Sequence, residues 1–310
     1  MFTGMPHVST DAGQKTLIVR GTAGQIAMAG WLVGELDVAA GSAQQSKDPF
    51  RLEYRVQNGS DDLVRVFNLK HITTSIDLQS TQMVLRVTTG ITKLFNYGRR
   101  PTLVAGGTSE QIRAPEWLIA ELDQPAGRQR DNLQTRFSAS YPAPGDPQEL
   151  VRVFYAADNA TVRDLDEISI TFRTIVGIIR IFALNSHKAL VLRGTAGQLS
   201  LAEWLFTELA SGARAPDPAQ KSGLPASKEY WDPEPVGKLG ELVRVFRFAP
   251  NTTARNVQEA ARSVQHIGRI PTVFPCTGLR AVVVRGNAQE VALAEALIRE
   301  RSFVPPDAVR

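Results

Sequence analysis

The sequence is poor in the residues that hold metals and form disulfides. Its 310 residues contain one cysteine and four histidines, which are His7, His71, His187 and His266. A single cysteine excludes an internal disulfide. The histidines share no position in the repeat described below, so they do not form a repeated zinc site. We therefore expect no metal and no cofactor in this chain.

Long apolar runs and a strong charge of one sign are also missing. No apolar run approaches the ~20 residues that span a bilayer, and residues 1–15 lack the basic and then apolar pattern of a signal peptide. Lys and Arg number 35 against 31 Asp and Glu, and a net charge of +4 makes nucleic-acid binding an unfavoured function. Hydrophobic residues make up 43% of the chain, which excludes a wholly disordered protein, and the length indicates two or three domains.

What the sequence does contain is an internal repeat. An apolar segment that ends in Gly-Thr or Gly-Asn, followed by a helical pattern, occurs four times, at 16–37, 102–123, 189–210 and 281–302. An LVRVF block precedes the last three copies, at 62–67, 149–154 and 241–246. A short apolar block ending in Phe lies between them, at 91–95, 178–182 and 270–274. Self-similarity of this kind indicates a chain built from structural repeats.

The spacing within the repeat is constant. Phe67 and Phe95 are 28 residues apart, and the two later copies keep the same interval. All variation in length falls between the units, in segments rich in Pro, Gly, Ser and Gln. Constant cores with variable connectors are typical of folded modules joined by surface linkers.

We therefore divide the chain into modules and linkers. The division is a partial module at 1–37, module 1 at 62–123, module 2 at 149–210 and module 3 at 241–302, with flexible linkers at 38–61, 124–148 and 211–240 and a tail at 303–310. The partial module is expected to contain only one strand and one helix, and its uncovered apolar surface should lean on module 1 or leave the segment poorly ordered. Because the sequence begins in the middle of a repeat unit, we also expect a truncated reading frame.

Each complete unit is predicted to fold as β-α-β-β-α. LVRVF has the β-branched and aromatic residues of a strand, and residues 162–176 place apolar side chains at steps of three and four, as a helix does. Gly90 and Gly177 follow the first helical stretch and suit a helix C-cap. The later blocks are two strands and a closing helix. The fold class is therefore α+β, with a three-stranded sheet and two helices on one face.

The Gly-Thr and Gly-Asn pairs are interpreted as a turn followed by a helix N-cap. The pairs are Gly21 and Thr22, Gly107 and Thr108, Gly194 and Thr195, and Gly286 and Asn287. GTAG at 21–24 and 194–197 also matches the G-x-x-G spacing of KH nucleic-acid modules, whose loop clamps a phosphate backbone. The other two copies of the repeat do not match this spacing. The loop here also joins a strand to a helix, whereas the KH loop joins two helices. A KH-like nucleic-acid-binding repeat protein remains the alternative function.

The order of the elements and the closing signature resemble a known family. LIVRGTAGQIAMAGWLVGELD and its three copies, with LVRVF upstream, are similar to the N-terminal modules of bacterial secretins. Those small β-α-β-β-α ring-building domains line the periplasmic vestibule of outer-membrane secretion and pilus channels. The third and fourth copies depart from the signature, because they end in Leu-Ala and Arg-Ser instead of Leu-Asp. The resemblance implies a scaffold or assembly role in the periplasm or cell envelope, and a cytoplasmic location is expected without it.

Two sets of arginines recur in the units. Arg65, Arg152 and Arg244 lie in the middle of the LVRVF strand, and Arg20, Arg193 and Arg285 end the strand before the closing helix. By strand alternation each shares a face with apolar neighbours. Three interpretations stay open: a basic sheet face for RNA or an acidic partner, a face that contacts the neighbouring module, and a solvated face whose arginine stems cover aromatic rings.

The strongest indication of an interaction surface in the sequence is a repeated tryptophan. Trp31, Trp117 and Trp204 occupy one position of the closing helix, which the fourth copy fills with Ala296. On a helical wheel Trp31 lies about 160° from the apolar stripe of the first helix. That stripe consists of Ile26, Ala29, Leu32, Val33 and Leu36.

An outward tryptophan implies that something covers it. The linkers after the first three helices carry aromatic residues, namely Phe50 and Tyr54, Phe137 and Tyr141, and Tyr230 and Trp231. We therefore expect each tryptophan to pack against the linker that leaves its own helix. The other interpretation is a rotated helix with the tryptophan in the ordinary core.

No arrangement of residues indicates catalysis. Cys276 has no counterpart in the repeat, which favours an inert, partly buried thiol. Asp164, Asp166 and Glu167 form a charged helix face that module 1 does not share, and a convergent nucleophile, base and orienting residue are not visible. We expect a non-enzymatic assembly protein that binds proteins or itself. The candidate interaction residues are Trp31, Trp117, Trp204, Arg65, Arg152 and Arg244.

Overall fold

The computed structural model describes residues 7–37, 52–56, 62–97, 100–125, 136–210, 226–231 and 241–302. In these residues the chain is an α+β protein with seven α-helices and four small antiparallel sheets. Two compact units are present: one holds the partial module and module 1, and the other holds modules 2 and 3.

The three complete modules share one order of elements. Module 1 contains β4 (Asp62–Asn68), α2 (Ser75–Thr89), β5 (Lys93–Tyr97), β6 (Thr102–Thr108) and α3 (Ser109–Leu122). Module 2 contains β8 (Glu149–Tyr155), α4 (Val162–Thr171), a π-helical turn η2 (Phe172–Val176), β9 (Arg180–Leu184), a 3-10 turn η3 (Asn185–His187), β10 (Ala189–Thr195) and α5 (Ala196–Ala210). Module 3 contains β12 (Leu242–Arg247), α6 (Ala254–His266), β13 (Val273–Cys276), β14 (Ala281–Gly286) and α7 (Ala288–Ser302). This is the β-α-β-β-α order that the sequence predicts.

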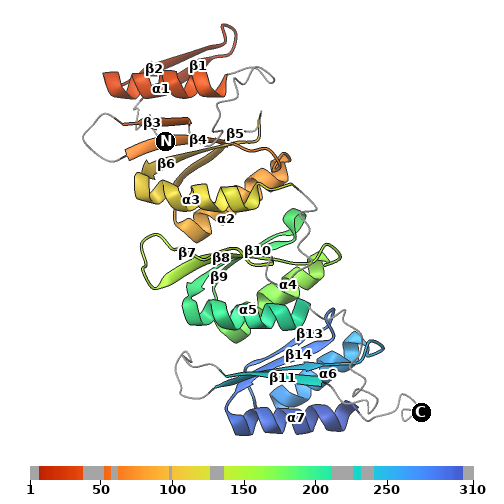
Figure 1. The fold of residues 1–310 in the computed structure, drawn as a ribbon. Helices are drawn as coiled ribbons and strands as arrows, with labels where there is room; N and C mark the ends of the chain where they lie inside the picture. Colours follow the sequence, from red (N-terminus) through yellow and green to blue (C-terminus); the bar gives the residue numbers. More distant parts are fainter. Residues whose placement is uncertain are drawn as a thin grey trace. The chain divides into compact units, whose positions relative to one another are not determined.

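In each module the last strand lies in the centre of the sheet. β6 pairs with β4 on one side and β5 on the other, and β10 and β14 pair in the same way with their own neighbours. The two helices of each module cover one face of its sheet (Figure 1). The first helix ends at a left-handed glycine in modules 1 and 2, with φ of 73° at Gly90 and 79° at Gly177. The C-caps predicted from the sequence are therefore confirmed.

The sheets are larger than the sequence analysis expects. A fourth, edge strand joins the sheet of module 1 as β3 (Leu52–Arg55) and that of module 3 as β11 (Ala226–Trp231). In module 2, Phe137 forms an antiparallel bridge with Phe154. The expectation of three-stranded sheets is wrong because segments assigned to linkers satisfy the outer backbone groups of the first strand. The remaining linker residues, Phe50 among them, and the tail at 303–310 lie outside the described residues.

The partial module also contains one strand more than expected. β1 (His7–Asp11) pairs with β2 (Thr16–Arg20), and α1 (Ala23–Leu36) follows. The Asp11 carboxylate accepts hydrogen bonds from the backbone N–H groups of Gly13 and Gln14. Lys15 then takes a left-handed conformation, as Lys188 and Arg280 do at the same place in modules 2 and 3. The hairpin was missed because the left-handed residue of its turn is a lysine, whereas the usual sequence signal of a hairpin turn places a glycine there.

The closing helices begin with a capping box. The Thr22 and Thr108 hydroxyls accept from the backbone N–H three residues later, and the side chain at that position returns to the N–H of the threonine. Thr195 with Gln198 and Asn287 with Glu290 make the same two bonds. The glycine before each cap provides space, since a Cβ on Gly107, Gly194 or Gly286 would lie 2.6–2.8 Å from the returning side chain. In these three copies the glycine is therefore explained by the close approach of that side chain.

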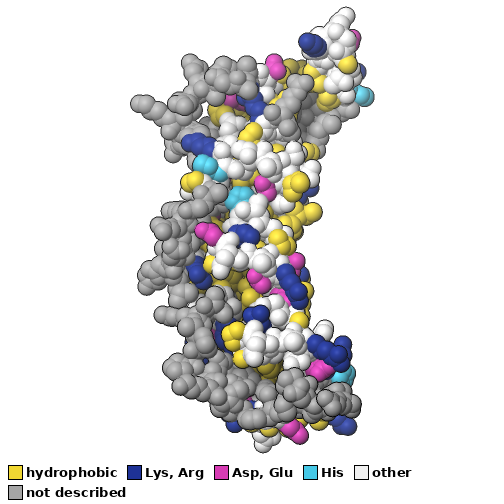
Figure 2. Space-filling model, turned by 90° about the vertical axis from the view of Figure 1, so that its right-hand side faces the viewer, with side chains coloured by type: hydrophobic (Ala, Val, Ile, Leu, Met, Phe, Trp, Pro, Cys, Tyr) yellow, Lys and Arg dark blue, Asp and Glu magenta, His cyan; other side chains and the backbone are white. Residues whose placement is uncertain are grey.

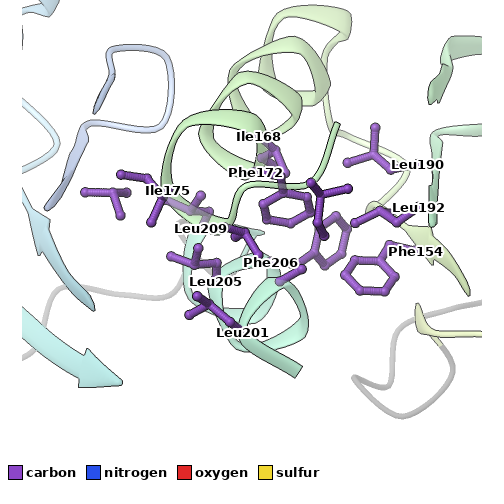
Figure 3. Close-up of a cluster of buried hydrophobic side chains, with 14 of the residues drawn as sticks. Phe154, Ile168, Phe172, Ile175, Leu190, Leu192, Leu201, Leu205, Phe206 and Leu209 are labelled. Carbon is purple, nitrogen blue, oxygen red and sulfur yellow. The ribbon is translucent and has the colours of Figure 1, made fainter. Parts of the chain in front are cut away.

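The core of each module lies between its sheet and its helices. In module 2, Phe154, Phe172 and Phe206 are fully buried, and the ring of Phe154 packs edge to face on the other two at 5.5–6.1 Å between centroids. Figure 3 shows these rings beside Leu190 and Leu192, which belong to the central strand β10. Aromatic residues therefore fill the space between the sheet and the helices.

Asp123, the acidic end of the Leu-Asp signature in module 1, fixes a loop. Its largely buried carboxylate accepts hydrogen bonds from the backbone N–H groups of Lys70 at 2.7 Å, His71 at 2.6 Å and Ile72 at 3.0 Å. The loop follows β4, so Asp123 ties the end of the second helix to the end of the first strand. Ala210 occupies this position in module 2 and cannot make the bonds.

Replacing Asp123 by alanine should destabilise the unit that contains module 1. Three N–H groups would lose their acceptor, and we expect the free energy of unfolding to fall by about 2–4 kcal/mol. Chemical denaturation would measure the loss. Asp37→Ala is the matched control, because Asp37 occupies the same repeat position with an exposed side chain; it should change stability by less than about 0.5 kcal/mol. Equal losses in the two variants would contradict this role.

Candidate protein-interaction site

The helix of the partial module packs on the outer face of the module 1 sheet, opposite the face that α2 and α3 cover. Met28 of α1 clusters with Val64, Val66 and Val104 of the sheet, and Trp31, Leu32 and Leu36 line the same contact. The partial module therefore leans on module 1, as the sequence predicts. The predicted stripe on this helix is split, however: Leu32 and Leu36 face module 1, whereas Ile26 and Val33 are each 45% exposed.

The helices of module 2 make the same kind of contact with the sheet of module 3. One buried cluster contains Ile175, Leu201 and Leu205 from module 2 together with Val243, Val245 and Val283 from module 3. In Figure 3, Ile175 and Leu205 project from the side of the helices opposite Phe154 and Leu192. These helices are therefore apolar on two faces, one toward their own sheet and one toward the next.

The two contacts use equivalent helix positions. Met28, Leu32 and Leu36 of α1 correspond in the repeat to Leu201, Leu205 and Leu209 of α5. Each set packs on the outer face of the sheet of the following module. The contact of a closing helix with the following sheet is therefore a repeated packing mode within this chain.

Polar groups fix the register of the contact between modules 2 and 3. The Glu167 carboxylate of α4 accepts hydrogen bonds from the Thr277 hydroxyl and the Gly278 N–H, each at 2.9 Å. Arg285 of β14 donates to the Ile175 carbonyl at 2.7 Å. Because these partners are positioned by the turn before β14 and by η2, they allow only one alignment of the sheet on the helices.

Cys276 lies in the same contact. Its thiol is buried and lies 3.2 Å from the Thr171 hydroxyl of α4. Burial raises the pKa of the Cys276 thiol to about 12, against its hydrogen bond with Thr171, which lowers it. The thiol is therefore neutral and inert in the folded protein, as the sequence analysis expects of a structural cysteine.

Each repeated tryptophan contacts a tyrosine of the segment that follows its helix. The ring centroids are 5.5 Å apart for Trp31 and Tyr54, 5.0 Å for Trp117 and Tyr141 in the short strand β7 (Tyr141–Pro142), and 5.3 Å for Trp204 and Tyr230. The expected packing against a linker aromatic is confirmed for these three tyrosines, whereas Phe137 packs on Phe154 and Phe206 instead. For Trp31 and Trp204 the tyrosine lies in an edge strand of the next sheet, so the pair joins a closing helix to the next module.

The LVRVF arginines are engaged inside their own modules. Arg65 pairs with Glu116 of α3 and Glu53 of β3. Arg152 pairs with Glu203 of α5, and Arg244 with Glu295 of α7 and Glu229 of β11. Each guanidinium group therefore links the first strand to the closing helix of its own module, and the open basic face considered from the sequence is not formed by these residues.

The outer helix face of module 3 is less apolar than that of module 2. The positions of Ile170 and Trp204 in module 2 are taken by Arg262 and Ala296 in module 3. The counterparts of the buried Ile175 and Leu201 are Ile267 and Leu293, which are 62% and 45% exposed. A more polar outer face is typical of the terminal unit of a repeat stack.

Charges of both signs are mixed on the surface. On the face shown in Figure 2, lysine and arginine side chains alternate with aspartate and glutamate and do not gather in one basic patch. Among the described residues no group of three or more His, Cys, Asp and Glu could hold a metal ion. No described helix has the length and apolar character needed to cross a membrane.

The chain resembles known proteins only weakly. No family model matches the chain, and no curated protein matches it. Among solved structures the chain is similar to the atomic model of the Salmonella SPI-1 type III secretion injectisome basal body proteins InvG, PrgH and PrgK, with 14% sequence identity and a TM-score of 0.17. The match covers 48% of this chain and 30% of that one. A TM-score this low carries no argument about function.

Removing Glu167 should open the contact around Cys276. Glu167→Ala leaves the Thr277 hydroxyl and the Gly278 N–H without an acceptor, at a cost of about 2 kcal/mol. We expect a thiol reagent to label Cys276 at least about tenfold faster in this variant than in the wild type. Glu259→Ala is the matched control, because Glu259 occupies the same position in module 3 and forms the same i,i+4 pair with an arginine. Unchanged labelling in Glu167→Ala would contradict the role of Glu167.

The Cys276 thiol should also make stability depend on alkaline pH. Its pKa of about 12 in the folded state lies above the ordinary value of about 8.5 in an unfolded chain. Its contribution to stability is therefore fully present below pH ~8.5 and is lost as the pH rises toward 12. Cys276→Ser should flatten the fall of unfolding free energy over this range, measured by denaturant titration. An unchanged pH dependence would contradict the assignment.

Trp204→Ala should loosen the edge strand β11 and leave module 2 folded. The Trp204–Tyr230 pair contributes about 0.5–1.5 kcal/mol beyond its buried area, so the cost should stay below the ~3–5 kcal/mol of a core aromatic deletion such as Phe206→Ala. Hydrogen exchange of the β11 amides would show the loosening. Equal destabilisation by the two variants, or β11 protection that does not change, would contradict this contact.

Proposed function

We propose that this chain is a non-enzymatic assembly protein whose modules bind other proteins through the contact of a helix layer with the outer face of a sheet. The contact is present within the chain between α1 and module 1 and between modules 2 and 3. Both examples combine apolar packing with an aromatic pair at the edge strand. A protein built from such units would bind its partners through apolar packing surfaces, and this role needs no catalytic pocket.

One observation carries the proposal: the outer face of the partial-module sheet is uncovered in the described residues. Ile18 of β2 is 62% exposed. Its counterparts Val104 and Val283 are 3% and 0% exposed, and each belongs to a cluster with the preceding helix layer. The partner that fits this face is a protein with a helix layer of the same kind, apolar on its outer side.

The resemblance to the secretin N-terminal modules supports a place in the bacterial cell envelope for this assembly. It rests on the Gly-Thr signature, the LVRVF strand and the β-α-β-β-α order, which together describe small domains that associate with one another. The KH-like alternative has no support from the geometry, because the Gly-Thr loops are filled by the capping side chains of Gln25 and Gln198.

In-cell photo-crosslinking would test the proposal. A photoreactive residue at position 18 should give discrete protein adducts, because the face around Ile18 is expected to meet a partner. The matched control is position 76, where Ile76 is 76% exposed on α2 and should give none. Absence of protein adducts at position 18 would overturn the proposal.

A nucleic-acid assay separates the alternative. The purified chain should not bind a mixed pool of RNA and single-stranded DNA in 50–200 mM salt. Binding that falls steeply with salt over this range would favour the KH-like function, since phosphate contacts release counterions.

A further inference from the structure

The partial module leaves its own core open on the inner side of its sheet. Ile26 and Val33 of α1 are each 45% exposed, and Leu17 of β2 is 44% exposed. The counterparts of Ile26 are Ile112, Leu199 and Val291, none more than 2% exposed, and the counterparts of Val33 and Leu17 are fully buried. Three positions that form the core of every complete module are therefore half uncovered here.

The sheet of the partial module also has a free edge. β2 pairs with β1, and no other described strand pairs with it. Its counterparts β6, β10 and β14 are each paired on two sides. In the complete modules the LVRVF strand fills this edge, and the helix after it covers the positions of Leu17, Ile26 and Val33. An unpaired strand edge beside exposed apolar side chains is a template for strand addition.

A charge marks the place where such a strand would begin. Arg193 and Arg285 pair at 2.6 Å with Glu149 and Glu241, the residues that open the ELVRVF segment of their modules. Arg20 occupies the same position in β2 and is exposed, and no ion pair of Arg20 occurs among the residues that the structure describes. The free edge therefore offers an arginine to an acidic residue at the start of an incoming strand.

We propose that the partial module binds a β-strand followed by an amphipathic helix that the described residues do not supply, and that these two elements complete it as a β-α-β-β-α module. The strand adds antiparallel to β2, with an acidic first residue beside Arg20 and an aromatic residue opposite Leu17, as Phe154 lies opposite Leu190 in module 2. The helix covers Ile26 and Val33. This inference deepens the proposed function, on which it rests, and concerns the inner core and the strand edge instead of the outer face around Ile18.

The closing helix gives the site a further preference. Glu116, Glu203 and Glu295 hold the arginine of the LVRVF strand in the complete modules, and the same position in α1 is Gly30. An arginine in the middle of the incoming strand would therefore lack its carboxylate from the helix. The natural strand is expected to carry an uncharged residue there.

A labelled peptide with the sequence of residues 149–177 is the probe, because it contains the strand and helix that fill the equivalent site in module 2. Fluorescence anisotropy would measure its binding to the full chain, whose monomeric state is checked by sedimentation. We expect saturable binding that Ile26→Asp weakens at least about 30-fold, since a charge would be buried in the completed core. The control Ile76→Asp, at an exposed apolar position on α2, should leave binding unchanged.

A charge swap tests the register of the strand. Arg20→Glu should weaken the peptide about fivefold, as expected for a partly exposed ion pair, and a peptide with Glu149→Arg should restore binding to this variant. A peptide with Arg152→Thr should bind at least as tightly as the parent peptide. No saturable binding to the monomeric chain, or equal binding to the wild type and Ile26→Asp, would overturn the proposal.

Self-association is the remaining outcome. Dimerisation through Arg20 and Ile26 would show that described elements of a second copy fill the site, and it would overturn the proposal. The crosslinking test at position 18 is independent of the inner core. Adducts there without peptide binding would leave the proposed function standing and remove only this inference.

Discussion

The structure depends on helices that are apolar on two opposite faces. Phe206 of α5 points into its own module, while Leu201 and Leu205 on the same helix pack against the sheet of module 3. A helix with two apolar faces is stable in water only when both are covered. The sheet of module 3 must likewise be covered on both faces, because Val243 and Val245 point to its outer face and alternate with residues that face its own helices. In the described contacts each module therefore supplies surface that its neighbour needs, and small units with modest cores gain stability from one another.

The sequence predicted the order of elements well and the packing direction less well. The constant 28-residue interval and the LVRVF block determined the strands, and the glycines at Gly90 and Gly177 marked the ends of the helices. The helical wheel assumed one buried face, so it placed Ile26 and Val33 with Leu32 and Leu36, although these pairs point toward different sheets. The edge strands were missed because segments such as Leu52–Arg55 are short, and they form strands only by pairing with strands such as β4. A single sequence cannot reveal that kind of tertiary pairing.

The candidate site shows the same division between local and tertiary information. The tryptophans could be found because they recur at one helix position and because aromatic residues follow them in the linkers. The role of Glu167 could not be found, since its acceptor contacts join residues 110 or more positions apart. The LVRVF arginines looked available for a partner because their carboxylate partners lie on another element, 51 residues away in each module. Long-range ion pairs of this type leave no periodic pattern in a sequence.

The edge strand changes where one repeat ends and the next begins. The aromatic pairs link Trp31 to Tyr54 in β3 and Trp204 to Tyr230 in β11, so the segment between two modules belongs structurally to the sheet that follows it. The natural cut in the chain therefore lies directly after a closing helix and not before an LVRVF block. A gene duplication or an engineered transplant that began at Asp62 would leave β3 behind and deprive Arg65 of Glu53. One that began immediately after α1 would carry a sheet with its complete outer edge.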